Sequence, residues 1–473
     1  MTFNVGGYPF AVLAHFSFVL AGLLIYAIGT HLSGQRRHPS AALAWVLTIA
    51  LLPYVGLPLY LVFGTRKFAR PPLLKTQTAR QPANGTLQGS AMATLEGMGL
   101  AAPAANRSIR FHRDGATAWK EFEQLARSAS SQLDICTYVL GDDTLGHQLA
   151  LLLQNRASAG VRIRLLLDAL GSWRTSAAQV RTLREAGVEV RWHMPLLRNL
   201  LSGRGNLRNH RKLTIADSQR LWTGGRNLAA EYFTGDVHSS PWTDLSFTID
   251  GPLAEQAQAL FDYHWHHSHG PGGTDQPLHL LLPGPGYDPA QDNAIRHLAQ
   301  MIPSGPDQGQ DTFYGLLLTA IFRAEKSVLA VTPYFVPDDA LLTALCLAAR
   351  RGVRVELVVP ERSNHRLADL ARARALRDLA AAGGRIRLAK GMVHAKALVI
   401  DDALALCGSL NLDSRSLFLN FELMVAFYDQ QDITEVTQWM SANFGHLQTF
   451  TPRPASLTSD VAEGLVRWLG FQI

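Results

Sequence analysis

The stretch Arg208-Asn209-His210-Arg211-Lys212 begins a motif that ends five residues further on, at Asp217. The same spacing of histidine, lysine and aspartate returns later in the chain as His394-Ala395-Lys396, followed by Asp401. In an extended segment, side chains two residues apart lie on the same face, so each motif presents an imidazole beside an ammonium group. The chain therefore carries two copies of one polar site element.

The match between the two copies extends beyond these three residue types. Glycine and asparagine follow each motif at equal offsets, as Gly224 with Asn227 and Gly408 with Asn411. The chain of 473 residues contains only seven lysines, and two of them occupy the matched motif positions. At average residue frequencies two such matches are improbable by chance, which indicates an internal duplication.

The segments before the two motifs repeat as well. Hydrophobic periodicity predicts helix, strand, helix and strand in turn, at 119–129, 133–139, 145–159 and 161–167, and again at 316–324, 328–332, 340–350 and 353–359. Two landmarks agree: Gly160-Val161-Arg162 matches Gly352-Val353-Arg354, and Asp142-Asp143 matches Asp338-Asp339. We therefore predict two α/β halves, 107–268 and 301–473, joined by a linker at 269–300 that begins rich in Gly and Pro.

Residues 1–70 have long uncharged stretches and are predicted to form a membrane-anchoring helical hairpin. No Asp, Glu, Lys or Arg occurs in residues 2–35, and 10–28 is long enough to cross the roughly 30 Å hydrocarbon core of a bilayer. A second apolar stretch, 41–64, carries two prolines and a glycine, so it is expected to kink or re-enter. Two core helices of a soluble domain, or a cleaved signal peptide, are the alternatives.

The composition restricts the partners of the chain. Residues 71–106 are rich in Ala, Gly, Thr, Gln and Pro, which predicts a linker after the anchor. The formal charge of +6 favours anionic partners, either phospholipid headgroups or nucleic acids. Three cysteines in apolar contexts suggest neither a disulfide framework nor a cysteine zinc site, and they fit a reducing compartment. Four histidines crowd together near residue 265 and are expected to be a solvated helix end rather than a metal site; they are His264, His266, His267 and His269.

Two histidines and two lysines around one space are suited to exchange at phosphorus. Such chemistry needs a nucleophile, an acid for the leaving alcohol, and positive donors for the phosphoryl oxygens. If the halves pack about a pseudo-two-fold axis, His210, Lys212, His394 and Lys396 supply these roles without a metal.

Each imidazole also needs a partner that sets its tautomer. Asp244 follows His210 and Glu422 follows His394 at comparable distances, so these two acids are the candidate orienters. Asp217 and Asp401 complete the motifs, and we group them with the catalytic residues. Their position five residues after the lysines nevertheless suggests that they brace strand ends.

The paired motifs resemble those of the phospholipase D superfamily, and nearly the whole chain after residue 106 is similar to bacterial cardiolipin synthases. The stretches Thr332-Pro333-Tyr334-Phe335-Val336-Pro337 and Leu419-Asn420-Phe421-Glu422 add to this resemblance. It implies an α/β fold of duplicated α-β-α sandwich halves with pseudo-two-fold symmetry, preceded by a transmembrane hairpin. One departure is Gly225, because the second motif has Ser409 at that position, as the family usually has.

The resemblance implies a phosphatidyl transfer. His210 would attack the phosphorus of phosphatidylglycerol to give a phosphohistidine, and His394 would protonate the departing glycerol. A second phosphatidylglycerol would then accept the phosphatidyl group and give cardiolipin. Lys212, Lys396, Asn227, Asn411 and Ser409 would hold the phosphate. The near symmetry of the halves leaves open which histidine attacks.

The resemblance also sets expectations about partners and location. We expect no cofactor, no metal, no nucleic-acid partner, and a multi-pass place in the inner membrane with the catalytic halves in the cytoplasm. A phospholipid hydrolase or a nuclease using the same site, and a non-catalytic membrane scaffold, are the alternatives. The second lipid, the membrane orientation and the oligomeric state stay open.

Overall fold

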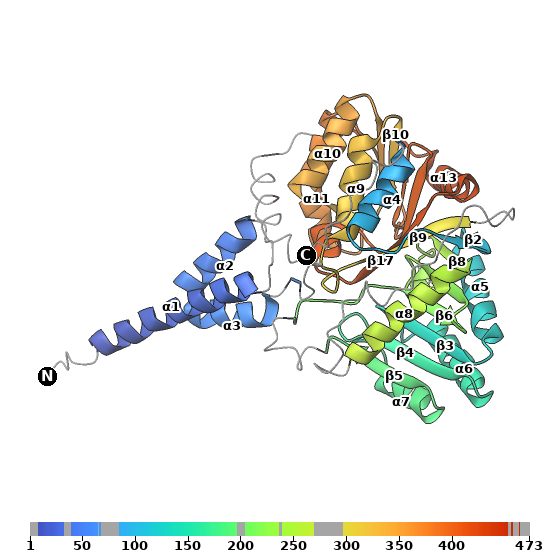
Figure 1. The fold of residues 1–473 in the computed structure, drawn as a ribbon, viewed down its shortest axis with the longest axis horizontal. Helices are drawn as coiled ribbons and strands as arrows, with labels where there is room; N and C mark the ends of the chain where they lie inside the picture. Colours follow the sequence, from blue (N-terminus) through green and yellow to red (C-terminus); the bar gives the residue numbers. More distant parts are fainter. Residues whose placement is uncertain are drawn as a thin grey trace.

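The computed structural model describes residues 8–32, 39–64, 66–67, 85–195, 204–235, 239–268, 297–452, 456 and 463. Three N-terminal helices project from a body made of two α/β halves, as Figure 1 shows. The first half contains a seven-stranded sheet. In spatial order its strands are β2 (Ser108–His112), β8 (Ser246–Asp250), β7 (Arg220–Gly224), β6 (Leu213–Ala216), β3 (Gln132–Thr137), β4 (Arg162–Asp168) and β5 (Glu189–His193).

The second sheet repeats this order with one strand added. It runs β1 (Ala104–Asn106), β9 (His297–Ser304), β17 (Glu422–Phe427), β15 (Leu404–Gly408), β14 (Ala397–Ile400), β10 (Ser327–Val331), β12 (Arg354–Pro360) and β13 (Arg385–Ala389). In each sheet three neighbouring strands are parallel, β3-β4-β5 and β10-β12-β13, and the remaining pairs are antiparallel. The predicted duplication is confirmed at the level of strand order. A small parallel pair, β11 (Phe335–Val336) with β16 (Leu412–Asp413), lies apart.

Helices cover both faces of the sheets. The first half has α5 (Gly115–Ser128), α6 (Thr144–Ser158), α7 (Ala177–Glu185), the short η2 (Ala230–Tyr232) and α8 (Pro252–His267). The second half has α9 (Thr312–Arg323), α10 (Asp339–Arg350), α11 (Arg366–Ala381), α12 (Ser414–Phe418) and α13 (Gln430–Phe444). Helices α5–α7 and α9–α11 bury the outer faces in separate cores. Between the sheets, α8 and α13 pack in a third core that both halves share, where the Phe111 and Phe427 rings lie 5.1 Å apart.

The residues that cap the N-termini of α6 and α10 show that one predicted match between the two halves is shifted. Asp143 accepts a hydrogen bond from Gly146 N at 2.8 Å, and Asp338 accepts one from Leu341 N at 3.1 Å. These two N-cap residues are equivalent, so matching Asp142-Asp143 to Asp338-Asp339 was wrong by one residue. The glycine landmarks do agree, because Gly160 and Gly352 both end a helix with positive φ, +87° and +93°.

The predicted linker at 71–106 is partly folded. Residues 85–106 include α4 (Leu87–Gly97), whose Ala91 and Leu95 are buried in the core of the second half. They also include β1, which pairs antiparallel with β9. A segment with weak periodicity is therefore ordered here by the surface on which it packs. Residues 269–296, most of the predicted second linker, lie outside the described residues.

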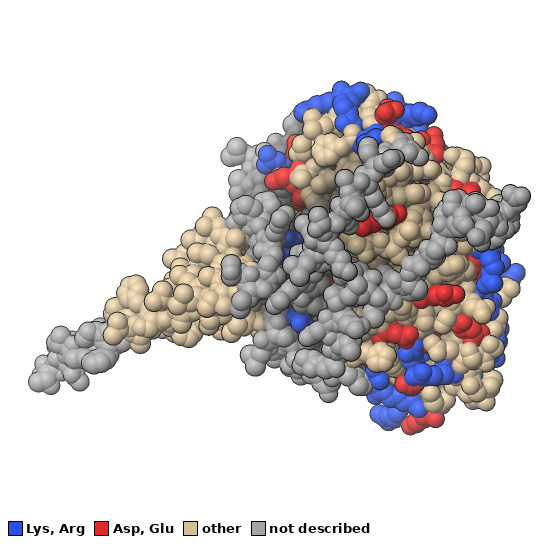
Figure 2. Space-filling model, viewed as in Figure 1, with Lys and Arg blue, Asp and Glu red and all other residues tan. Residues whose placement is uncertain are grey.

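The predicted anchor contains α1 (Tyr8–Leu32), α2 (Pro39–Leu51) and α3 (Pro53–Phe63). Among the described residues only α1 is long and apolar enough to cross a membrane, by length and composition. The second apolar stretch breaks at Leu52, which leaves the helical region with φ −131° before Pro53 starts α3. The expected kink is present, and α2 and α3 are each too short to span alone. Figure 2 shows an anchor surface without the blue or red of charged side chains that mark the body.

Candidate active site

The two histidine–lysine pairs lie just before β6 and β14, beside the ends of β3 and β10. All four residues are buried, with exposures from 1% to 8%. Lys212 Nζ donates to His210 O at 2.7 Å, while Lys396 Nζ lies 2.8 Å from Nδ1 and 3.0 Å from Nε2 of His394. Each lysine is therefore held beside its own histidine.

A backbone hydrogen bond joins each histidine to the other half. His210 N donates to Phe421 O at 2.9 Å, and His394 N donates to Thr243 O at 2.8 Å. The bridged residues Phe421 and Thr243 come directly before the two candidate orienters. The docking of the halves therefore brings each acid to the histidine of the opposite half.

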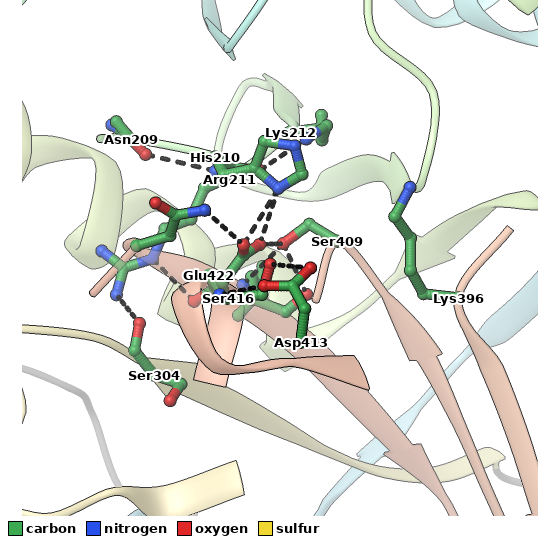
Figure 3. A network of polar contacts seen from close by, with 12 residues as sticks. Asn209, His210, Arg211, Lys212, Ser304, Lys396, Ser409, Asp413, Ser416 and Glu422 are labelled. Carbon is green, nitrogen blue, oxygen red and sulfur yellow. Dashed lines mark hydrogen bonds and ion pairs between the residues drawn. The ribbon is translucent and has the colours of Figure 1, made fainter. Parts of the chain in front are cut away.

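The side chains of the histidines and the acids also pair between the halves. His210 Nδ1 lies 3.0 Å from Glu422 Oε2, and His394 Nδ1 lies 2.7 Å from Asp244 Oδ2. Figure 3 shows the Glu422 carboxylate beneath the His210 ring. Pairing each histidine with the acid downstream in its own half was wrong, because contact between the halves sets the partners. With Nδ1 held by a carboxylate, Nε2 is the ring nitrogen that faces a substrate; in His394 it also lies 3.0 Å from Lys396 Nζ.

The lengths of the two acids explain why Gly225 corresponds to Ser409. Ser409 Oγ donates to Glu422 Oε2 at 2.5 Å and accepts a hydrogen bond from Leu423 N at 2.9 Å. In the first half Asp244 Oδ1 itself accepts from Leu245 N at 2.7 Å, and a Cβ on Gly225 would lie 2.1 Å from that oxygen. The aspartate thus fills the space that the serine hydroxyl occupies in the other half. The structure places Ser409 against Glu422 rather than free for a phosphate.

Electrostatics link the two motifs into one site. Burial lowers the pKa of His210 to about 4, with Lys212 and Lys396 adding to the effect and Glu422 opposing it. Burial lowers the pKa of His394 to about 3, again with both lysines contributing and Asp244 opposing them. Both imidazoles are therefore neutral at pH 7 and carry a lone pair. Burial also lowers the pKa of Lys396, to about 8.

Asn227 and Asn411 share two features of their surroundings. Both are buried, and the side-chain oxygen of each has no hydrogen-bond partner among the described residues. Asn227 Nδ2 donates to the Tyr232 hydroxyl at 2.8 Å. A buried acceptor without a donor is suited to a hydroxyl group of a ligand. Phosphate binding by the two amides stays a prediction.

Asp217 and Asp401 do not lie with the histidines, so grouping them with the catalytic residues was wrong. They follow the far ends of β6 and β14, about 13 Å along the strand from the lysines. The Asp217 carboxylate accepts hydrogen bonds from the backbone N of Ser130, Ser131 and Gln132, and that of Asp401 from Glu325, Lys326 and Ser327. Both aspartates brace the turn before the neighbouring strand.

Several residues that lie beside the histidines were not predicted from the sequence. The Tyr138 ring lies 5.0 Å from the His210 ring, and the rings of Tyr232 and Trp242 lie 4.9 Å and 5.6 Å from the His394 ring. Asp413 is buried near Lys396, and burial raises its pKa to about 6. Of these residues, only Tyr138 could have been predicted from the sequence, because it directly follows β3, the strand that ends beside the first motif.

Arg211 is the residue that most distinguishes the two motifs, since Ala395 stands at the equivalent position. It is fully buried and reaches into the second half. There it donates to Glu422 O at 2.9 Å, to Ser304 O at 3.1 Å, and to the Asp307 carboxylate at 3.0 and 3.1 Å (Figure 3 draws the first two partners). The arginine therefore fixes the backbone of the residue that orients His210.

The histidine cluster near residue 265 is not a solvated helix end throughout. His264 is 3% exposed and lies 3.2 Å from Asp307, and it also contacts Arg211. His266 and His267 bond to backbone oxygens of their own helix, whereas His269 lies outside the described residues. Across the described ranges no group of three or more His, Cys, Asp or Glu side chains is arranged to hold a metal ion.

We expect Asp307→Asn to lower the free energy of unfolding by about 3–5 kcal/mol, because it leaves the Arg211 charge buried without its counter-ion. Urea unfolding of the detergent-solubilised chain, followed by tryptophan fluorescence, measures this change. Glu189→Gln is the matched control, since its ion pair with Arg162 is exposed and its loss should cost less than about 1 kcal/mol. Equal effects of the two substitutions would show that the buried Asp307–Arg211 pair contributes no more to the free energy of unfolding than the exposed pair does.

Comparisons with known proteins agree with this geometry. Residues 122–265 and 317–447 match the family described as cardiolipin synthase, PLD-like domain, and residues 22–64 match the phospholipase D-nuclease N-terminal family. The cardiolipin synthase A of Pseudomonas entomophila (strain L48) is 31% identical over 440 residues, which cover 88% of each chain. That of Pseudomonas fluorescens is 32% identical over 469 residues, 93% of this chain and 92% of the relative.

A solved structure shows the same fold. The phosphatidylserine synthase of Haemophilus influenzae Rd KW20 superimposes with a TM-score of 0.61 at 14% identity, covering 81% of this chain and 100% of that one. The duplicated sheets and the two crossed histidine–carboxylate pairs define a two-motif enzyme of the phospholipase D superfamily. Within that class, the chain belongs to the cardiolipin synthase family. It is a phosphatidyltransferase that associates with the membrane.

Proposed function

We propose that the enzyme makes cardiolipin and glycerol from two phosphatidylglycerol molecules, by two successive displacements at phosphorus. The observation that carries this proposal is the crossed pairing of His210 with Glu422 and of His394 with Asp244. It leaves Nε2 of His210 available to a substrate, and it places the His394 ring, which Asp244 supports in its protonated form, beside Lys396. One site can then supply a nucleophile, an acid and positive charge.

In the first displacement, His210 Nε2 attacks phosphorus and forms a P–N bond. The bond from phosphorus to the glycerol oxygen breaks, and His394 gives that oxygen a proton. Because His394 is neutral before substrate binds, it takes up one proton from solvent when the phosphate enters; the negative phosphate and Asp244 both favour this protonated form. Lys212 and Lys396 stabilise the charge that develops on the phosphoryl oxygens.

In the second displacement, a hydroxyl of another phosphatidylglycerol replaces the departed glycerol. His394 takes the proton from this hydroxyl, its oxygen attacks phosphorus, and the P–N bond to His210 breaks. Cardiolipin leaves, His210 is again neutral, and His394 holds the proton of the attacking hydroxyl, which it returns to solvent or gives to the next glycerol. The unpaired amide oxygens of Asn227 and Asn411 are suited to accept hydrogen bonds from glycerol hydroxyls.

The surroundings of the two rings favour His210 as the nucleophile. Lys396 Nζ lies within 3.0 Å of both ring nitrogens of His394, so this ring already has an ammonium group against it. Within the described part of the chain, no protein group is bonded to Nε2 of His210. An imidazole whose lone pair is unoccupied is the better nucleophile, and one that already exchanges hydrogen bonds is suited to move protons.

We also propose that the chain is a multi-pass protein of the bacterial inner membrane, with the catalytic halves on the cytoplasmic side. The length of α1 supports an anchor, and the three cysteines are buried and unpaired, which fits a reducing compartment. Protease added to inverted membrane vesicles should degrade the catalytic halves, while right-side-out vesicles should protect them. Degradation in right-side-out vesicles would place the halves on the other side.

The function is tested with the purified full chain in vesicles that contain phosphatidylglycerol, with chelator and no added metal. We expect cardiolipin and free glycerol to appear in equal amounts, because each transfer releases one glycerol. Mass spectrometry of the lipids and enzymatic measurement of glycerol follow both products.

Other products would decide against the proposal. Phosphatidic acid without cardiolipin would identify a hydrolase, in which water resolves the intermediate. Cleavage of added DNA or RNA without lipid turnover would identify a nuclease. Loss of activity with chelator, restored by a divalent metal, would contradict the metal-independent mechanism.

A further inference from the structure

Large apolar side chains lie in solvent where the chain continues beyond β4 and β12, at the catalytic end of the sheets. Leu170 and Trp173 lie in the turn after β4 and are 40% and 67% exposed, and Leu367 lies in the first turn of α11, after β12, and is 53% exposed. Strands β4 and β12 are equivalent, so the two segments are related by the duplication. We refer to Leu170, Trp173 and Leu367 as the rim.

The first turn is tied directly to the His210 side of the site. Asp168, which ends β4, accepts a hydrogen bond from Asn209 N at 2.8 Å. Ser172 Oγ donates to Tyr138 O at 2.9 Å, and the Tyr138 ring is the one that packs on His210. Trp173 is therefore one residue from a side chain that positions the wall of the catalytic site.

The second turn borders the same site from the other half. The Tyr334 hydroxyl donates to Asn364 Oδ1 at 2.5 Å, and the Tyr334 and His365 rings lie 5.7 Å apart. Tyr334 follows β10, the strand that ends beside His394 and Lys396. Leu367 comes two residues after His365, so the rim flanks the site on both sides.

The membrane anchor is attached at this same end of the sheets. Val62 O in α3 accepts a hydrogen bond from Gly205 N at 2.9 Å, and Lys67 Nζ donates to Gln308 O at 3.0 Å. Gly205 stands five residues before His210, and Gln308 directly follows the Asp307 that binds Arg211. The end of the anchor and the rim are thus both held by segments that lead into the site.

We propose that the rim rests in the headgroup region of the bilayer that holds α1, so that the catalytic site opens onto the lipid surface. Tryptophan and leucine are the side chains that partition into this region. The Arg174 guanidinium lies 4.9 Å from the Trp173 ring centroid and is placed to meet anionic lipid headgroups. This inference rests on the proposed lipid substrate, and it adds the route by which that substrate arrives.

Exposed apolar side chains also occur elsewhere on the catalytic halves, and they provide a comparison for the rim. Among the described residues of the catalytic halves, three other large apolar side chains are more than 36% exposed: Leu151 on α6, Phe322 on α9 and Leu347 on α10. They lie in the middle or the second part of helices that cover the outer faces of the sheets. The rim differs from them because it lies at the end of the sheets where the histidines lie and where the anchor is attached; its composition is similar to theirs. These three residues therefore provide a matched control.

The test compares the rim variant Leu170→Ser/Trp173→Ser/Leu367→Ser with the control variant Leu151→Ser/Phe322→Ser/Leu347→Ser. Both are made in the full chain and reconstituted in phosphatidylcholine vesicles. One substrate is long-chain phosphatidylglycerol within the bilayer, and the other is dihexanoyl-phosphatidylglycerol dissolved as monomers. We expect the rim variant to lose about tenfold or more of kcat/KM on the bilayer substrate and less than about twofold on the dissolved one. The control variant should match the wild type on both.

Three results would separate the possible failures. Equal losses on both substrates would mean that the rim supports the site rather than the lipid contact, and no loss on either would remove its role; both outcomes overturn the inference. If the wild type makes no cardiolipin from either substrate, the proposed function fails. The rim is then judged by fluorescence: brominated phosphatidylcholine should quench the wild type more than Trp173→Phe, and equal quenching would overturn bilayer contact.

Discussion

Replacing either His210 or His394 with alanine should lower the turnover number by roughly four orders of magnitude or more, because each removes one member of a single catalytic unit. In the proposed mechanism, loss of His210 removes the atom that bonds to phosphorus. Loss of His394 removes the proposed proton donor for the first displacement and proton acceptor for the second. Cardiolipin formation in phosphatidylglycerol vesicles measures both variants.

A matched control for these variants exists within the chain. His297 at the start of β9 is mostly buried and lies 2.8 Å from the Asp432 carboxylate, which resembles the catalytic pairs. It stands seven residues before Ser304, the partner of Glu422 in the sheet, and so about 23 Å from the site along the strand. His297→Ala should keep nearly normal turnover in the folded fraction. Near-normal rates in either catalytic variant would contradict a site shared by both halves.

The second large effect is expected from the orienting acids. Glu422→Gln and Asp244→Asn keep the shape of each side chain but remove the charge that sets the imidazole tautomer and stabilises the imidazolium. Each should lower turnover about 10²- to 10⁴-fold. Asp432→Asn, which alters the non-catalytic pair, is the control and should leave turnover nearly unchanged.

The two acid variants can be told apart by the leaving group. A phosphatidyl ester of p-nitrophenol needs no proton donor, so the first displacement on it depends on His210 and not on His394. Because the pairs are crossed, Asp244→Asn should release p-nitrophenol in a nearly normal burst, whereas Glu422→Gln should release it slowly. The reverse result would mean that each acid serves the histidine of its own half, or that His394 is the nucleophile; the same assay on His394→Ala decides between these.

Much of the fold followed from local patterns. The helix predicted at 119–129 corresponds to α5, and the strand predicted at 353–359 corresponds to β12, because both have strong periodicity. Residues 85–106 were assigned to a linker, and this was wrong for α4 and β1. Their order comes from packing on α9 and pairing with β9, and such contacts have no signature in a weakly periodic segment.

The motifs and the duplication were predicted from spacing, and the anchor was predicted from its long uncharged stretches. Three features depended on contacts between segments far apart in the chain: the pairing of each histidine with the acid of the opposite half, the burial of Arg211 against Asp307, and the placement of the rim and the anchor at one end of the sheets. Ser409 supports Glu422 within the second half, where β15 and β17 are neighbouring strands. His210 and Glu422 are 212 residues apart in the chain, and spacing relates only residues that share an element. Contacts between residues so far apart depend on how the surfaces of the two halves pack together. The free energy of that packing comes from residues of both halves and cannot be assigned to either sequence motif alone.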